Sequence, residues 1–153
     1  MAKLNNDLTR FLEAQNKLYL TALTELKKGK KETHWMWFIF PQIKGLGRSE
    51  MSKLYSIENL QQSEEFLEHP VLGKHLIEVS RVLLEFKMKS AEAIFGDLDA
   101  LKLQSCMTLF SLTNNTDPVF QEVLDAFFSG KFDPLTLSII NEMIHPALQQ
   151  TEF

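Results

Sequence analysis

Apolar residues recur at helical spacing along almost the whole chain, and this pattern restricts the fold more than any other feature of the sequence. From residue 8 to residue 26 they follow the i, i+3, i+4, i+7 rule of a helix with one buried face. The same spacing returns over residues 71–86 and 98–109. A half-buried strand would instead alternate apolar and polar residues, and no segment of the sequence does so. We therefore expect an all-α fold.

Residues that start or end helices separate these periodic segments. Asp accepts hydrogen bonds from the free N–H groups of a first turn, Pro suits the first helical position, and Gly often ends a helix. The predicted starts are Asp7, His69-Pro70, Asp97, Asp117-Pro118 and Asp133-Pro134, and the predicted ends are Gly29 and Gly130. Shorter helices are expected at residues 33–39, 50–56, 64–68 and 91–95. The connections are short, so we expect one compact, single-domain bundle or array of about five longer helices plus short helical segments. It would span residues 1–153, with a loosely ordered tail at 146–153.

Length and composition argue against several classes of protein. The 153 residues suit one domain, and 44% apolar residues are too many for a disordered chain. A net charge of −4 argues against non-specific binding to nucleic acid or to anionic lipid. The single cysteine suits a reducing compartment, and we see neither a secretory signal nor an apolar run of membrane length. We expect a cytoplasmic protein without a membrane partner, and the oligomeric state stays open.

Metal and thiol chemistry find little support in the sequence. The four histidines are not spaced with cysteines or carboxylates as a metal site would need, so we expect no metal and no cofactor. Cys106 lies in an apolar helical segment, which is typical of a small core residue rather than a reactive thiol.

The stretch from His34 to Ser49 is chemically unlike the rest of the chain. It reads HWMWFIFPQIKGLGRS, with four aromatic residues in its first half and two glycines between two cations in its second. Gly45 and Gly47 permit backbone conformations or close approaches that other residues resist. Cations beside such a backbone, before the helix start at Ser49, are typical of a place that accepts an anion. The spacing matches neither a Walker loop nor a dinucleotide fingerprint, so a structural turn with surface cations is the competing interpretation.

Polar residues elsewhere on apolar helix faces could complete a pocket with this stretch. Gln15 should point inward from the first helix, where its amide needs partners. Lys102, Ser105 and Thr108 interrupt the apolar side of the third long helix. Each could instead be a buried polar residue bonded to the backbone, but several facing one aromatic loop favour a pocket.

These motifs together resemble a bacterial family called domain of unknown function 1810. The resemblance rests on DLTRFLEAQ, HWMWFIFPQIKGLGRS, HPVLG and IFGDLDALKLQSCMTLF, and it covers almost the whole chain. It implies a compact, mostly α-helical domain and no established activity, and it adds Tyr55 to the motif residues. Some members carry the label calpastatin, which does not suit this chain because such inhibitors are disordered. The chain departs from the family pattern at Ser56, where Ala is usual, and at His75, where an Arg is usual.

We consider three interpretations of the stretch. In the first, the protein binds or processes a small anionic ligand, nucleotide- or phosphate-like, in an inter-helix pocket built around residues 34–49. His34 would then serve acid–base chemistry if a reaction occurs, because histidine side chains in general exchange protons near neutral pH; otherwise it caps or packs a helix start. The ligand-binding residues would be Gln15, Trp35, Trp37, Gln42, Lys44, Gly45, Gly47, Arg48, Ser49, Tyr55, Lys102, Ser105 and Thr108.

The second interpretation is a protein-interaction module. Trp35, Met36 and Phe38 would then form an exposed aromatic hot spot on the surface. The third is purely structural, and it predicts that the stretch is buried with no cavity beside it.

Overall fold

Nine α-helices and one isolated β-bridge make up the part of the chain that the computed structural model describes, residues 7–146. The all-α prediction is confirmed. The expectation of a loosely ordered tail falls on residues that lie, apart from Pro146, outside the described part. The helices are α1 Thr9–Lys27, α2 Met36–Ile39, α3 Glu50–Leu54, α4 Leu60–Glu68, α5 Leu72–Leu84, α6 Ala91–Phe95, α7 Asp97–Ser111, α8 Pro118–Phe128 and α9 Pro134–Ile144. None of these helices is long and apolar enough to cross a membrane.

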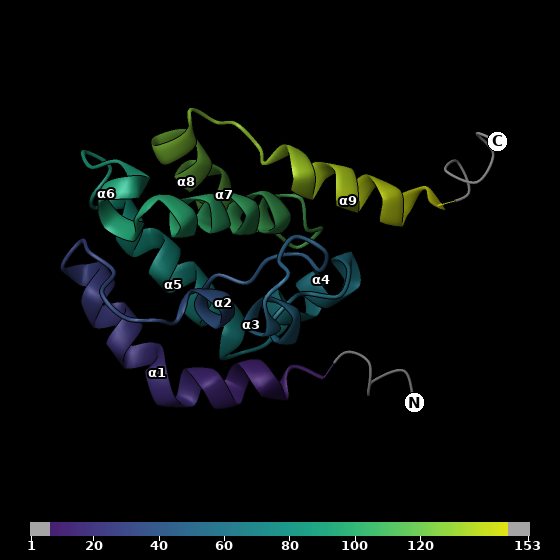
Figure 1. Cartoon of the computed structure of the whole chain (residues 1–153), viewed down its shortest axis with the longest axis horizontal. Helices are drawn as coiled ribbons and strands as arrows, with labels where there is room; N and C mark the ends of the chain where they lie inside the picture. The colour runs from purple at the N-terminus through teal and green to yellow at the C-terminus, as the bar shows by residue number, and fades with distance from the viewer. Residues whose placement is uncertain (1–6, 147–153) are drawn as a thin grey trace.

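Helix α5 occupies the middle of the molecule. It packs against α1 on one side and against α4 and α8 on others, while α7 packs against α6, α8 and α9 (Figure 1). The short helix α2 packs against α1, and α9 extends past the end of α7 at the upper right of Figure 1. The connection between α1 and α4 contains the aromatic and glycine motifs.

A chain of aromatic rings joins four helices through the core. Phe66 of α4 meets Phe11 of α1 edge-on at 5.2 Å and Phe110 of α7 at 5.5 Å, and Phe110 meets Phe120 of α8 at 5.8 Å. All four side chains are fully buried. Buried aromatic side chains contribute large apolar areas and favour such tilted or edge-on contacts, so this cluster fixes the helices relative to one another.

Side-chain caps hold three of the helix starts that the sequence predicts, those of α3, α8 and α9. Asp117 accepts a hydrogen bond from the Val119 N–H at 2.8 Å, and Asp133 accepts one from the Thr136 N–H at 3.1 Å. Ser49 caps α3 in the same way through the Ser52 N–H at 3.1 Å. These short-range bonds satisfy first-turn donors that have no partner inside the helix.

Three predicted helix starts differ from those in the structure, and identifiable hydrogen bonds explain each difference. Helix α5 begins at Leu72 rather than at Pro70, because the His69 ring nitrogen Nδ1 accepts hydrogen bonds from the next free N–H groups. Helix α4 begins at Leu60, not at residue 64, since the Asn59 side chain caps it. Helix α2 covers only the end of the predicted segment 33–39, because a carboxylate of α1 holds the residues before it.

Candidate functional site

The aromatic stretch divides between the core and the surface. Trp35, Met36 and Phe38 are 0%, 1% and 3% exposed, whereas Trp37 is partly exposed and His34 is exposed. The exposed hot spot expected of an interaction module is therefore wrong for these three side chains. Within the single turn of α2, Met36 and Phe38 face inward and Trp37 faces outward, while Trp35 just before the helix is buried and His34 is exposed.

A buried carboxylate of α1, Glu25, anchors the start of the stretch. It accepts hydrogen bonds from the Glu32 N–H, the Thr33 N–H, the Thr33 hydroxyl and the Trp35 ring N–H, over distances of 2.6 to 3.0 Å. Burial by itself would raise the pKa of Glu25, but these hydrogen bonds outweigh it and lower the pKa to about 2. Trp35 therefore serves as a core anchor with its ring N–H satisfied, and it forms no wall of a pocket.

One cavity lies beside the outward half of the stretch, and we call it the Trp37 cavity. It has a volume of about 400 Å³, and His34 and Trp37 line it together with Lys102 and Lys31. Asp99 pairs with both lysines, at 2.9 Å from the Lys31 ammonium and 3.2 Å from that of Lys102. Asp97 lines the cavity as well, so its two lysines and two aspartates carry no net formal charge, and the cavity offers an incoming anion little free positive charge.

A second cavity, the loop cavity, is built by residues 43–57. The loop closes where Ile43 and Ile57 form a parallel bridge, with the Lys44 N–H 2.8 Å from the Ile57 carbonyl and the Ile57 N–H 2.8 Å from the Gln42 carbonyl. Gly47 is required here, because a Cβ at this position would lie 2.4 Å from the Ser52 side chain. The resulting cavity of about 390 Å³ is lined by Lys44, Gly45, Gly47, Ser52, Lys53, Ser56 and Glu58.

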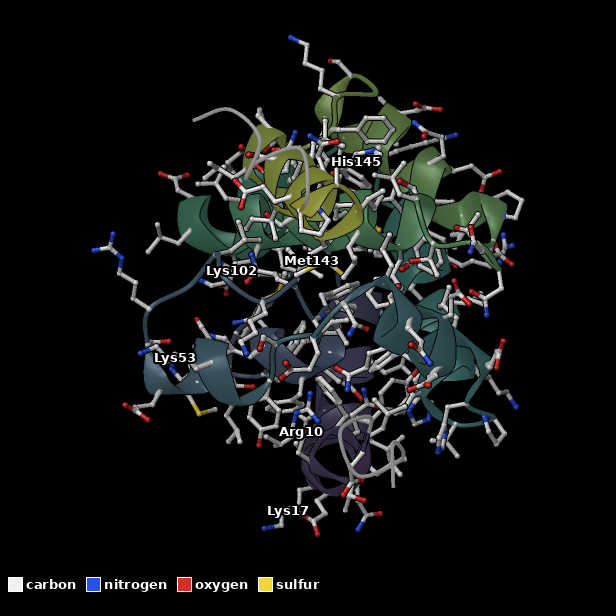
Figure 2. All side chains as sticks on the ribbon, turned by 90° about the vertical axis from the view of Figure 1, so that its right-hand side faces the viewer. Arg10, Lys17, Lys53, Lys102, Met143 and His145 are labelled. Carbon is white, nitrogen blue, oxygen red and sulfur yellow. The ribbon has the colours of Figure 1, made fainter. Side chains whose placement is uncertain are left out.

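The loop cavity carries a net positive charge and free backbone donors. The Lys44 ammonium lies 3.3 Å from Glu58, but both side chains are well exposed, and Lys53 is exposed as well. Within residues 7–146, no hydrogen bond engages the N–H groups of Gly45, Gly47 or Arg48. Figure 2 shows Lys53 on α3, apart from Lys102, which lies between α9 and the short helices.

Arg10 of α1 supports the loop from beneath. Its guanidinium donates 2.8 Å hydrogen bonds to the carbonyls of Leu54 and Ser56, at the end of α3. Burial lowers the pKa of Arg10 from its ordinary value, while Glu58 and Asp7 oppose that effect. Because the Arg10 guanidinium donates its hydrogen bonds to these carbonyls, it positions the loop and does not line the loop cavity.

Gln15 belongs to a third cavity, between α1 and the start of α5, which we call the α1–α5 cavity. Its volume is about 620 Å³, and Gln15, Tyr19 and His75 line it together with the apolar residues Leu12, Leu20 and Val71 and the polar residues Glu13, Asn16 and Lys17. The Gln15 amide nitrogen donates to the Phe38 carbonyl at 2.8 Å, and its amide oxygen lies 2.7 Å from the His75 ring nitrogen Nδ1. His75, the departure from the family pattern, is thus the partner of a predicted site residue.

The polar residues predicted on α7 serve two different roles. Ser105 donates to the Asp133 carboxylate at 3.0 Å, and the Thr108 hydroxyl accepts from the Asp133 N–H at 2.9 Å. Both are buried, so they hold the start of α9. Lys102 instead faces the Trp37 cavity.

The structure therefore separates the predicted site residues instead of bringing them into one pocket. His34, Trp37 and Lys102 share the Trp37 cavity, and Lys44, Gly45 and Gly47 share the loop cavity. His34 also lines a further cavity of about 450 Å³ together with Tyr55 and Arg10. The other predicted residues lie elsewhere: Gln15 in the α1–α5 cavity, Trp35 in the core, Gln42 at the bridge, Arg48 exposed on the loop, Ser49 at the α3 cap, Tyr55 against the rings of Phe11 and Phe38, and Ser105 and Thr108 at α9.

Sequence reasoning missed several residues that shape these places. Glu25 had a usable signal, because a carboxylate on the apolar face of α1 requires a partner, and a tryptophan N–H follows ten residues later. Lys31 and His75 had no such signal, since their neighbours in space include residues from distant parts of the chain. Lys53 lies within the same loop as Lys44, but its exposed side chain gives no signal in the sequence.

Comparisons with known proteins agree with the fold and add no activity. A family model described as "Protein of unknown function (DUF1810)" matches residues 5–140. The crystal structure of the conserved hypothetical protein Rv1873 from Mycobacterium tuberculosis is similar, with 38% sequence identity and a TM-score of 0.86. This match covers 88% of the present chain and 96% of that chain. A comparison with curated proteins finds no match.

Proposed function

Because the chain belongs to the DUF1810 family, whose description states no activity, we propose a function from its own geometry: it binds a small anionic, phosphate-bearing ligand in the loop cavity. The observation that carries the proposal is the meeting of Lys44, Lys53 and unpaired backbone N–H groups on one cavity. The ligand would be a phosphomonoester or nucleotide whose phosphate enters the loop.

The chemistry of the loop suits a phosphate oxygen. Glycine N–H groups at Gly45 and Gly47 can approach an anion closely because no side chain shields them. The Ser52 side chain, which packs against Gly47, and the Lys53 side chain line the same cavity, and phosphate accepts hydrogen bonds from hydroxyl and ammonium groups alike. Glu58 competes with the ligand for Lys44, which would keep the affinity modest.

We propose the cytoplasm of a bacterial cell as the location, because the lone thiol of Cys106 suits a reducing compartment. His34 stays a candidate acid–base residue for the case that the bound ligand is processed. It lines the Trp37 cavity rather than the loop cavity, so it would act only on a ligand that reaches both.

A titration with inorganic phosphate and with AMP, followed by backbone amide NMR, tests the proposal. We expect the amide signals of Gly45, Gly47 and Arg48 to move with a dissociation constant of the order of millimolar. Lys53→Ala should weaken binding about fivefold, since an exposed charge contact is worth about 1 kcal/mol. Glu58→Gln should strengthen it by a similar factor, because Lys44 is then released from its carboxylate.

Lys87→Ala is the matched control, because this exposed lysine follows α5 and lies outside the loop. It should leave the affinity unchanged. Signals that stay in place up to about 50 mM of either compound would exclude phosphate binding on this scale. Equal losses from Lys53→Ala and Lys87→Ala would show that only overall charge matters.

A further inference from the structure

His75 is held in one particular protonation pattern by a chain of three groups. The Phe38 carbonyl can only accept a hydrogen bond, so the amide nitrogen of Gln15, 2.8 Å away, must face it. The amide oxygen of Gln15 therefore faces His75, and this oxygen can only accept. The 2.7 Å contact then requires a proton on Nδ1 of His75, which leaves the lone pair of a neutral ring on Nε2.

The imidazole is also fixed in position. It stacks on the Tyr19 ring with centroids 3.5 Å apart and planes 8° from parallel. The Tyr19 hydroxyl in turn donates to the Glu78 carboxylate, which keeps the phenol ring in place. Both Gln15 and Tyr19 are almost fully buried, so the ring has little freedom to turn.

Within the described part of the chain, the Nε2 atom is left without a hydrogen-bond partner beside a cavity whose wall combines apolar and polar side chains. Among the described residues no hydrogen bond engages it, although His75 lines the α1–α5 cavity. Burial lowers the pKa of His75, while Glu78 opposes and Lys74 assists that effect, so the ring is neutral at physiological pH. Leu12, Leu20 and Val71 form apolar parts of the same wall.

From this geometry we propose that the α1–α5 cavity binds a small, mostly apolar molecule that donates one O–H or N–H to Nε2 of His75. Leu12, Leu20 and Val71 would cover the body of the ligand, and the fixed lone pair would select its donor group. The volume of about 620 Å³ lies in the range of small-molecule pockets. The site shares no lining residue with the loop cavity, so it does not depend on the function proposed above.

Phenol and anisole make a matched pair of probes, because they share a ring and differ in the donor. Titration of each into the full chain, followed by NMR of the side chains and backbone around His75, should show phenol binding about fivefold more tightly, the value of one hydrogen bond. His75→Phe keeps a ring to stack on Tyr19 but removes the acceptor. It should reduce the affinity for phenol to that for anisole, whereas His145→Phe, at the exposed end of α9, should change nothing.

A second measurement needs no variant. Long-range nitrogen–proton NMR of the unmodified protein should report His75 as the neutral tautomer protonated at Nδ1, and Gln15→Leu should relax that preference. The proposal is overturned if the proton resides on Nε2, if neither probe binds near His75, or if phenol and anisole bind equally.

Discussion

Replacing Glu25 with glutamine removes one charge from the core and tests how the aromatic stretch is held. The carboxylate accepts four hydrogen bonds, including that of the Trp35 ring N–H at 2.8 Å. Glutamine has nearly the same shape, but its amide nitrogen is a donor and would face donors of the segment before α2. We therefore expect Glu25→Gln to destabilise the fold even though it adds no bulk.

The magnitude follows from the pKa of Glu25. Hydrogen bonds lower it from 4.5 to about 2 against the opposing effect of burial. At 1.36 kcal/mol per pH unit, this difference corresponds to about 3 kcal/mol of folding stability. Because folding lowers the pKa, the contribution is complete well above pH 4.5 and is lost as the pH falls toward 2. By about pH 3, roughly 2 kcal/mol of it should be gone.

Urea unfolding monitored by tryptophan fluorescence measures this contribution directly. At pH 7 we expect Glu25→Gln to lower the unfolding free energy by about 2 to 3 kcal/mol, and the gap from the unmodified protein should narrow between about pH 5 and pH 3. Glu32→Gln removes an exposed charge nearby and should cost less than about 0.5 kcal/mol. A gap at pH 7 no larger than this control, or one that does not narrow with pH, would refute the reasoning.

Three further predictions concern packing and capping. Gly73→Ala would place a Cβ 2.0 Å from the Leu67 carbonyl oxygen, so α4 and α5 must separate, and urea unfolding should show a loss of about 2 kcal/mol or more. Cys106 is fully buried and burial raises its pKa, so an aromatic disulfide reagent should label it only after denaturant is added; rapid labelling of the native protein would contradict this. Asp133→Ala removes the cap of α9 and the acceptor of the Ser105 hydroxyl, and it should lower the unfolding free energy by about 1 to 2 kcal/mol in the same assay. Asp133→Asn keeps an oxygen that can cap the helix, so it should retain most of the stability that Asp133→Ala loses.

The helix starts could be predicted because their determinants are local. Asp117 and Asp133 accept bonds from residues two and three positions ahead, so the sequence alone contains both partners. The wrong start predicted for α5 also has a local cause. His69 provides the hydrogen-bond acceptor that Asp provides elsewhere, and a histidine cap is not a common signal. Helix α2 was overestimated for a different reason, because Glu25 of α1 binds the N–H groups of Glu32 and Thr33 and holds the segment before α2 outside the helix.

The location of the site could be predicted only in part. Lys44, Gly45 and Gly47 meet on one cavity because they are close in sequence and their loop closes on itself. Lys102 comes from α7, and whether it joins that loop depends on how α7 crosses the molecule, which no sequence period specifies. The structure places it instead with Trp37 and with Asp99, three residues before it on α7.

Polar residues on apolar faces can be sorted by where their hydrogen bonds end. The Ser105 hydroxyl donates to Asp133, whose carboxylate also accepts from the N–H and the hydroxyl of Thr136 on α9, so every one of these polar groups has its partner inside the fold. The Gln15 amide leads to His75, whose far nitrogen is left free at a cavity. The two residues look alike in the sequence, because each interrupts an apolar helix face. A polar residue has a structural role when every donor and acceptor in its hydrogen-bond network has a partner within the fold. It can take part in binding when the network ends with an unpaired atom at a cavity wall, because only such an atom can bond to a ligand.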